Sequence, residues 1–114
     1  MTLSNSTVSG NSAVTEGGGI ANENRGTVTL SNSTVSGNSA ANGGGIYNQS
    51  GAVTLHNTKV SEDKATQKGG GIYNKATVAG NNDRITGNTA PEGAGIFNEP
   101  PGEVNLKNSN VQSP

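Results

Sequence analysis

Apolar and polar residues alternate along this chain in short runs, and the runs return at an interval much longer than a helical turn. In the clearest copy one polar residue separates Val28 from Leu30, and Val35 follows after a polar stretch. The most regular marker is an Ile after a glycine-rich triplet, which recurs at Ile20, Ile46, Ile72 and Ile96, at steps of 26, 26 and 24 residues. Alternation with β-branched residues predicts strands, and a repeat of this length predicts a solenoid.

Each period predicts three short strands. In the second copy they are Thr27–Ser31, Thr34–Ser36 and Gly44–Tyr47, and the segments between them have turn chemistry. Since identical residues return one period later, each strand should lie parallel to its copy in the next coil, about 4.8 Å away. The expected fold is an all-β parallel solenoid, a β-helix of about four coils of 24–27 residues. It spans residues 1–114 as a single segment that begins and ends within a repeat, without caps.

Stacking of the coils turns the repeat into columns of equivalent residues. Besides the Ile column, the expected core contains three apolar columns: Val28, Val53, Val78 and Val104; Leu30, Leu55 and Leu106, with Gly80 as a gap; and Val8, Val35, Val60, Ile85 and Val111. A column of small residues fits a narrow corner and consists of Ala13, Ala40, Ala65 and Ala90. One coil cannot bury such residues alone, so neighbouring coils must complete the core.

Asn forms three further columns. They are Asn5, Asn32, Asn57, Asn82 and Asn108; Asn11, Asn38 and Asn88, with Asp63 in the third coil; and Asn22, Asn48, Asn74 and Asn98. Asn tolerates the left-handed backbone conformation, and its amide can donate to and accept from an identical amide one coil away. We expect these columns at the corners of the coils, as structural ladders rather than ligand contacts. The glycine triplets should allow sharp bends and close approach of the coils.

The composition is unusual for a folded domain but is compatible with this fold. Leu, Ile, Val and Phe make up 19 of 114 residues, which is low enough to raise the alternative of disorder. Disordered chains usually also carry a high net charge, whereas the net charge here is −1. In a disordered chain, apolar residues need not recur at fixed positions of a repeat, so the periodic pattern favours a folded solenoid.

Charge and cysteine content restrict the function classes. A net charge of −1 gives no support for electrostatic binding to nucleic acid or to an anionic membrane. No apolar stretch approaches the length of a membrane span, and we expect no signal peptide because the chain starts within a repeat. The absence of Cys excludes disulfides and thiolate metal sites. No metal or other cofactor is expected.

The segment Val-Thr-Leu-Ser-Asn-Ser-Thr-Val-Ser-Gly-Asn-Ser-Ala at 28–40, followed by Gly-Gly-Gly-Ile-Tyr-Asn at 43–48, carries a resemblance to known repeats. It resembles the right-handed parallel β-helix repeats of the pectin-lyase-like superfamily, in particular those of bacterial secreted and cell-surface proteins. It is more loosely similar to polymorphic outer-membrane proteins with their Gly-Gly-Ala-Ile tetrapeptides, although their Phe-x-x-Asn element is missing. The resemblance implies right-handed coils and an extracellular or cell-surface location, but this architecture hosts lyases, hydrolases and adhesins alike.

A charged patch is the first candidate ligand surface. Lys59 and Arg84 share a column and should lie one coil apart, and Asp83 precedes Arg84. This patch could bind an acidic sugar, or its residues could be ordinary solvent-facing positions. A lyase of this architecture would need acidic residues for Ca²⁺ and a base for the sugar proton. Asp63 and Asp83 are the only Asp residues and differ in phase, so a Ca²⁺ cluster is poorly supplied.

An aromatic column next to the Ile column is the second candidate surface, and it contains Tyr47, Tyr73 and Phe97. By alternation these rings should face away from the Ile side and form an outward stripe. Such a stripe could bind sugar rings, or the rings could stack on each other and stiffen the surface. His56 is the single His, and we expect it to point outward without a catalytic partner.

The expected function follows from a regular repeat that gathers no catalytic set. We expect a non-catalytic structural or adhesive segment of a secreted or cell-surface bacterial protein, facing polysaccharide or cell-surface glycans. One alternative is a fragment of a polysaccharide lyase or hydrolase. Another is an ice-binding face made by Thr2, Thr29 and Thr54, although this column breaks at Ala79 and Asn105. Open coil edges should promote self-association.

Overall fold

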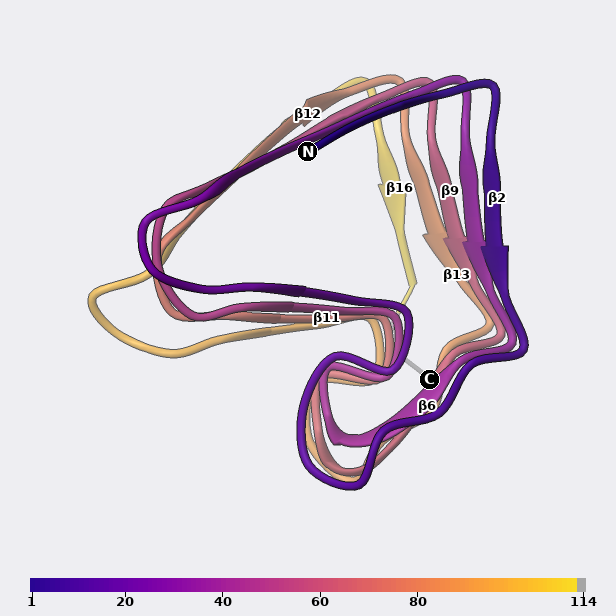
Figure 1. Ribbon diagram of the computed structural model, residues 1–114, viewed down its shortest axis with the longest axis vertical. Helices are drawn as coiled ribbons and strands as arrows, with labels where there is room; N and C mark the ends of the chain where they lie inside the picture. Colours follow the sequence, from indigo (N-terminus) through magenta and orange to yellow (C-terminus); the bar gives the residue numbers. More distant parts are fainter. Residues whose placement is uncertain (113–114) are drawn as a thin grey trace.

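The computed structural model describes residues 1–112 and shows a parallel β-solenoid of about four turns (Figure 1). The described residues form strands, turns and bends but no helix. The molecule measures 27 × 25 × 22 Å, and successive coils nearly overlap in the view of Figure 1. The all-β parallel solenoid that the repeat predicts is therefore confirmed.

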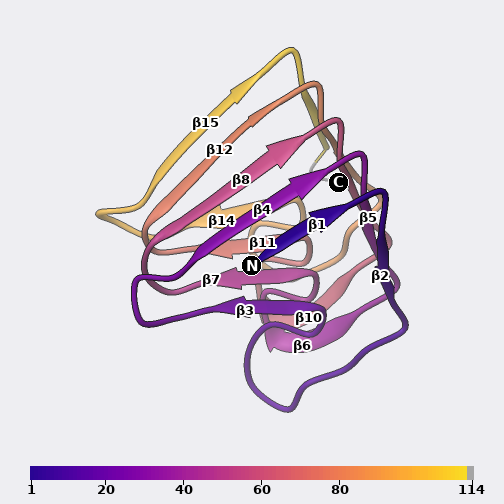
Figure 2. The ribbon, with the colours of Figure 1, turned by 45° about the horizontal axis from the view of Figure 1, so that its top comes forward.

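Strands from successive coils stack into three large parallel sheets. The first sheet contains, in order, β1 (Thr2–Ser4), β4 (Thr27–Ser31), β8 (Ala52–His56), β12 (Thr77–Asn81) and β15 (Glu103–Lys107). The second contains β2 (Thr7–Ser9), β5 (Thr34–Ser36), β9 (Lys59–Ser61), β13 (Arg84–Thr86) and β16 (Asn110–Val111). The third contains β3 (Ile20–Asn22), β7 (Ile46–Asn48), β11 (Ile72–Asn74) and β14 (Ile96–Asn98). Figure 2 shows the strands of the first sheet rising in this order.

The register of these sheets equals one repeat, so equivalent residues lie side by side. In the third sheet, for example, Ile72 lies between Ile46 and Ile96. The resulting core is one buried cluster of Ile20, Val28, Leu30, Val35, Ile46, Val53, Leu55, Val60, Ile72, Val78 and Ile85. Full burial of each such side chain contributes about 1.5–3 kcal/mol. The end coils add partly buried residues, namely Leu3, Val8, Ile96, Val104 and Leu106.

The expectation of three strands per coil is wrong for the two middle coils, which each contain a fourth strand. β6 (Ser39–Asn42) pairs with β10 (Lys64–Lys68) in a parallel two-stranded sheet. This strand belongs to a projection of each coil that lies outside the three large sheets and beside the third one in Figure 1, which we call the lobe (residues 12–19, 39–45, 64–71 and 89–95). The sequence pattern missed the strand because Ala40 and Ala65 are its buried residues and give no alternating apolar signal.

The glycine triplet makes the tight connection from the lobe to the third sheet. The strand predicted at Gly44–Tyr47 is β7, which begins at Ile46 and not at Gly44. A Cβ at Gly44 would overlap the Lys64 carbonyl oxygen and lie 2.6 Å from that of Gly70. Only glycine fits so close to the next coil, which explains why the triplet recurs.

Candidate functional site

One Asn ladder joins the coils at the corner between the third and first sheets. The Asn22 amide nitrogen donates to Asn48 Oδ1 at 2.9 Å, and Asn48 donates in turn to Asn74 Oδ1 at 2.8 Å. The ladder ends with Asn98, whose Oδ1 accepts a hydrogen bond from the Asn74 amide nitrogen at 2.9 Å. The Asn48 nitrogen also donates to the Thr77 carbonyl at 2.9 Å, so both of its donors are satisfied. A buried polar network with satisfied donors holds this corner rigid.

A second ladder runs between the second sheet and the lobe. The backbone and side-chain nitrogens of Asn11 donate to Asn38 Oδ1 at 2.9 and 3.2 Å. The same two nitrogens of Asn38 donate to Asp63 Oδ1 at 2.9 and 3.0 Å. The Asp63 backbone nitrogen then donates to Asn88 Oδ1 at 2.9 Å. Asp63 therefore takes the acceptor role of an Asn in this ladder.

The first Asn column has a different role, because its residues are needed for their backbone conformation rather than for side-chain hydrogen bonds. Its members have φ angles of 50°, 50°, 49°, 59° and 50°, at Asn5, Asn32, Asn57, Asn82 and Asn108 respectively. All five side chains are exposed. These residues occupy the left-handed turn that Asn tolerates, so only two of the three Asn columns are amide ladders.

A ladder of short side-chain oxygens was missed by sequence reasoning. It follows the first Asn column by one residue and consists of Ser6, Ser33, Thr58, Asp83 and Ser109. The Thr58 backbone nitrogen donates to Asp83 Oδ1 at 2.8 Å, and the Asp83 backbone nitrogen donates to Ser109 Oγ at 3.0 Å. The regular return of a hydroxyl at this phase was the sequence signal that could have found it.

Both Asp residues are buried, so the interpretation of Asp83 as part of a surface patch is wrong. Each Asp is 1% exposed, and its Oδ2 has no hydrogen-bond partner among the described residues. Burial raises the pKa of Asp63 to about 7, although hydrogen bonds from Asn38 oppose the shift. Burial also raises the pKa of Asp83. A buried polar atom without a partner costs about 1–3 kcal/mol, and more when the group is charged, so burial disfavours the carboxylate form of each Asp.

Asp83 also explains the gap that Gly80 leaves in the Leu column. A Cβ on Gly80 would overlap Asp83 Oδ2 and would lie 2.9 Å from Leu106 Cδ2. The carboxyl group of Asp83 thus lies against the place where other coils have a Leu side chain. The two departures of the fourth coil from the repeat, Gly for Leu and Asp for Ser or Thr, are therefore structurally linked.

The two cations of the charged patch do lie side by side. Lys59 in β9 pairs in register with Arg84 in β13, and both side chains are exposed. Because Asp83 is turned into the core, it contributes no carboxylate to this surface. Binding of an acidic sugar by Lys59 and Arg84 stays a prediction.

The aromatic column faces away from the Ile side, but the expectation of an open outward stripe is wrong. Tyr47 is 3% exposed and Tyr73 is 6% exposed. Ring centroids lie 5.0 Å apart between Tyr47 and Tyr73, and 5.2 Å apart between Tyr73 and Phe97, in stacked geometry. The lobe lies next to this face of the third sheet, and Lys68 of β10 places its Nζ 5.0 Å from the Phe97 ring centroid. The lobe, which the sequence pattern missed, therefore covers the aromatic column.

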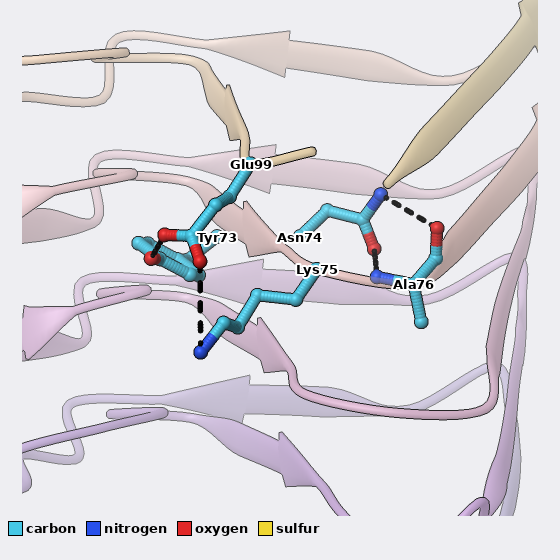
Figure 3. Close-up of polar contacts among 5 residues, drawn as sticks. All are labelled: Tyr73, Asn74, Lys75, Ala76 and Glu99. Atoms are coloured by element: carbon cyan, nitrogen blue, oxygen red, sulfur yellow. Dashed lines mark hydrogen bonds and ion pairs between the residues drawn. The ribbon is translucent and has the colours of Figure 1, made fainter. Parts of the chain in front are cut away.

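A polar cluster surrounds the hydroxyl group of the middle ring of the aromatic column, Tyr73 (Figure 3). The Tyr73 hydroxyl donates to Glu99 Oε1, and Lys75 Nζ lies 3.7 Å from Glu99 Oε2. The Tyr73 hydroxyl and then the Lys75 ammonium hold the pKa of Glu99 below its ordinary value. Burial raises the pKa of Tyr73, and burial together with the Glu16 carboxylate raises the pKa of Tyr47 to about 12. Both phenols are therefore neutral in the folded protein at physiological pH.

The loops at the corner held by the first Asn ladder border an open polar notch of about 520 Å³. The loops of the outer coils, 23–26 and 99–102, are longer than the middle loops, 49–51 and 75–76. The middle loops therefore recede, and the loop 99–102 of the fourth coil projects farthest in Figure 1. The notch is lined by Asn24, Arg25, Gln49, Ser50, Lys75, Pro100 and Pro101. Sequence reasoning missed the notch, although the number of residues between each ladder Asn and the next core Val differs from coil to coil.

The outer face of the first sheet carries the remaining candidates. His56 is exposed there, in register with Ser31 on one side and Asn81 on the other. A shallow depression of about 330 Å³ lies beside it over Gly80. Thr54 is in register with Ala79 on the same face, where the Thr column breaks as expected.

Two further properties concern residues 1–112 only. In this part of the chain no three His, Asp or Glu side chains gather in a way that could hold a metal ion. The same part includes no helix with the length and apolarity needed to cross a membrane.

Comparison with known proteins supports the looser of the two resemblances. No curated protein and no solved structure matches the chain, and nothing in these comparisons supports the pectin-lyase-like superfamily. Residues 32–49 match the family model of the Chlamydia polymorphic membrane protein repeat. The matched segment contains β5, β6 and β7, and so includes one strand of the lobe and the glycine triplet. Within its parallel β-solenoid, the chain thus carries a segment similar to the Chlamydia polymorphic membrane protein repeat.

Proposed function

We propose that this chain is a non-catalytic structural or adhesive segment of a bacterial surface protein, whose outer faces contact polysaccharide or cell-surface glycans. The observation that carries the proposal is that both Asp and both Tyr side chains are used inside the solenoid. Asp63, Asp83, Tyr47 and Tyr73 are all buried in ladders that join one coil to the next. These groups are thereby kept from any substrate, while a periodic surface of hydroxyl and amide groups remains for contact with sugars.

The location in this proposal is the outer membrane or cell surface. It is supported by the match of residues 32–49 to the Chlamydia polymorphic membrane protein repeat. A solenoid in which each repeat contacts its neighbours also suits an extended stalk, because coils can be added without changing the core. Surface labelling and protease shaving of intact cells that express the native protein would test this location.

The adhesive role is tested by retention of the purified chain on immobilised polysaccharides and host-cell glycans at physiological salt. We expect saturable binding to a subset of these surfaces, and no binding by heat-unfolded chain used as the control. Failure to bind any glycan surface while the solenoid remains folded would refute the adhesive role.

The lyase or hydrolase alternative draws on the adjacent cations Lys59 and Arg84. It predicts release of uronate products from pectin or alginate, whereas the adhesive proposal predicts none. Robust turnover that is abolished by Lys59→Ala or Arg84→Ala would overturn the non-catalytic proposal. The burial of Asp83 speaks against this alternative, because it removes from the surface the acid that precedes Arg84 in sequence.

We also propose that end coils associate with one another. β1 and β15 are the edge strands of the first sheet, and Val111 in the last coil is 41% exposed. Unpaired strand edges are templates for pairing with another chain. Light scattering should show an average mass that rises with protein concentration, and a constant monomer mass over a wide range would contradict this proposal.

A further inference from the structure

We propose that the corner notch binds a short oligosaccharide that carries a carboxylate, and that Arg25 holds the carboxylate. This inference rests on the proposed carbohydrate-facing function and adds a site and a ligand class to it. The notch volume of about 520 Å³ falls in the range of roughly 300–1,000 Å³ that is typical of small-molecule sites.

The floor of the notch is held by the buried Asn ladder directly beneath it. The Asn22 amide nitrogen donates to the Gly26 carbonyl at 3.0 Å and to the Ser50 carbonyl at 3.3 Å. The Gln49 backbone nitrogen donates to the Asn22 carbonyl at 2.9 Å, and the Lys75 backbone nitrogen donates to a carbonyl of the ladder at the same distance. A floor that is fixed before binding lowers the entropy lost when a ligand is ordered on it.

One wall presents Arg25 in a backbone conformation that its own side chain does not favour. Asn24 and Arg25 have φ angles of 57° and 60°, two consecutive residues in the left-handed region. The Arg25 backbone nitrogen donates to Ser50 Oγ at 2.8 Å, which ties the first coil's loop to the second. Asn tolerates this conformation, whereas for a residue such as Arg it costs about 1–3 kcal/mol and is found preferentially at functional sites. With its backbone held in this way, Arg25 lines the notch.

The opposite wall is formed by Pro100 and Pro101 of the fourth coil. Their loop is closed by a hydrogen bond from the Gly102 backbone nitrogen to the Glu99 carbonyl at 2.7 Å. The Asn98 amide nitrogen donates to the Gly102 carbonyl at 3.0 Å, which anchors this wall to the Asn ladder. Pyrrolidine rings offer a rigid apolar surface without an N–H donor. That surface suits the C–H face of a sugar ring.

The charged side chains that line the notch are both cationic. Lys75 is paired with Glu99 at 3.7 Å, whereas Arg25 forms no ion pair within residues 1–112. The planar guanidinium of Arg matches a carboxylate with two parallel hydrogen bonds. The side chains of Asn24, Gln49 and Ser50 supply further donors and acceptors for sugar hydroxyls. Apart from Pro100 and Pro101 the lining is polar or charged, so the chemistry favours a carboxylated saccharide over an acidic peptide.

The test is an NMR titration of the isotope-labelled chain with trigalacturonate and, in parallel, with its fully methyl-esterified form. We expect the acid to shift the backbone amides of Arg25, Gln49, Ser50 and Lys75. The ester should bind about tenfold more weakly, because it keeps the hydroxyls but loses the charge that Arg25 recognises. Equal affinity for the acid and the ester would overturn the proposal.

Two variants separate the notch from general charge effects. Arg25→Gly removes the guanidinium and leaves a residue that adopts the left-handed conformation freely, and we expect it to weaken binding of the acid about tenfold. Arg84→Gln removes the same charge from the exposed face of β13, and we expect less than about a twofold change because exposed charges far from the ligand are screened. Equal weakening by both variants, each with an unchanged folded spectrum, would overturn the assignment to Arg25.

The remaining outcomes distinguish this inference from the proposed function. An acidic peptide that binds the notch more tightly than trigalacturonate would overturn the ligand class. Absence of trigalacturonate binding by a chain that is still retained on other glycan surfaces would overturn the notch inference and leave the adhesive function intact. Binding at the notch by a chain that no glycan surface retains would support the notch and refute adhesion.

Discussion

Asn38 donates two hydrogen bonds to a single carboxylate oxygen of Asp63, at 2.9 and 3.0 Å, while the other oxygen of Asp63 has no partner among the described residues. Where the ladder has Asn, the amide nitrogen at this place donates to a carbonyl of the preceding coil, as from Asn88 to Val60 at 3.0 Å. A carboxylic acid with its proton on Oδ2 would supply the same donor. Asp63 therefore fits the ladder as a neutral acid.

The first prediction is a pH-dependent stability that Asp63→Asn removes. The pKa of Asp63 rises from an ordinary value of 3.8 to about 7 on folding. Between these values the folded chain keeps a proton that the unfolded chain has lost, so the free energy of unfolding falls as pH rises through this window. The stabilisation is present in full below about pH 4 and is lost by about pH 7. Asp63→Asn should match the parent at pH 4 and exceed it at pH 8, by up to about 4 kcal/mol.

Urea unfolding at pH 4, 6 and 8 measures this difference, and Glu62→Gln is the matched control. Glu62 is the exposed neighbour of Asp63 in sequence, and its charge contributes to the raised pKa. Its replacement should reduce the pH dependence only slightly, because burial is the main cause of the shift. A constant stability difference between Asp63→Asn and the parent over this pH range would mean that Asp63 is ionised in the folded chain.

The second prediction concerns the linked departures at Gly80 and Asp83. Gly80→Ala should destabilise the parent by about 1–3 kcal/mol, because the added Cβ overlaps Asp83 Oδ2. The same change should cost less when Asp83→Ser restores the residue type of the hydroxyl ladder. A double-mutant cycle measured by urea unfolding should therefore show a coupling energy of about 0.5–3 kcal/mol. Additive effects of the two substitutions would contradict the proposed contact.

The parts of the fold that the sequence predicted are those in which one residue type repeats at one phase. The core position of Ile46 and Ile72 could be predicted from the sequence alone, because an apolar β-branched residue that recurs in register with its copy is usually buried. The lobe was missed because its strand buries only Ala40 and Ala65. Small residues carry a weak periodic signal, so an element built from them is invisible to hydrophobic patterning.

The predictions at the candidate site were wrong for two reasons: the lobe was missed, and a charged residue was assumed to be exposed. Tyr47 was expected to be exposed because alternation gives only the face of a sheet, not what covers that face. Asp83 was expected at the surface because acidic residues are rarely buried. Its phase in the repeat, shared with Ser33 and Thr58, was the better guide, since all three side chains form a hydrogen bond with the backbone of a neighbouring coil.

The third prediction separates the two roles of Asn. Asn48→Ala should destabilise the chain by about 2–4 kcal/mol, because it leaves the Asn22 amide and the Thr77 carbonyl without their partner in a buried ladder. Asn32→Gly should change stability by less than about 1 kcal/mol, because Asn32 is exposed and its φ of 50° is open to glycine. Thermal and urea unfolding of both variants would measure the contrast. Similar losses would mean that the exposed column also acts through its side chains.

The fourth prediction uses the two Tyr residues, which are the only ones in the chain and report on the buried aromatic ladder. Burial raises the pKa of both, that of Tyr47 to about 12. Tyrosinate absorbance should therefore stay low at pH 10, where an exposed Tyr is half ionised. Above pH 10 the unfolded chain loses protons that the folded chain keeps, so stability should fall as pH rises.

The chain in concentrated urea is the control, and its Tyr residues should titrate near their ordinary pKa. Tyr73→Phe isolates the titration of Tyr47. Full ionisation near pH 10 with an unchanged folded spectrum would show that the lobe leaves the rings open to solvent, and would restore the outward stripe as a binding surface.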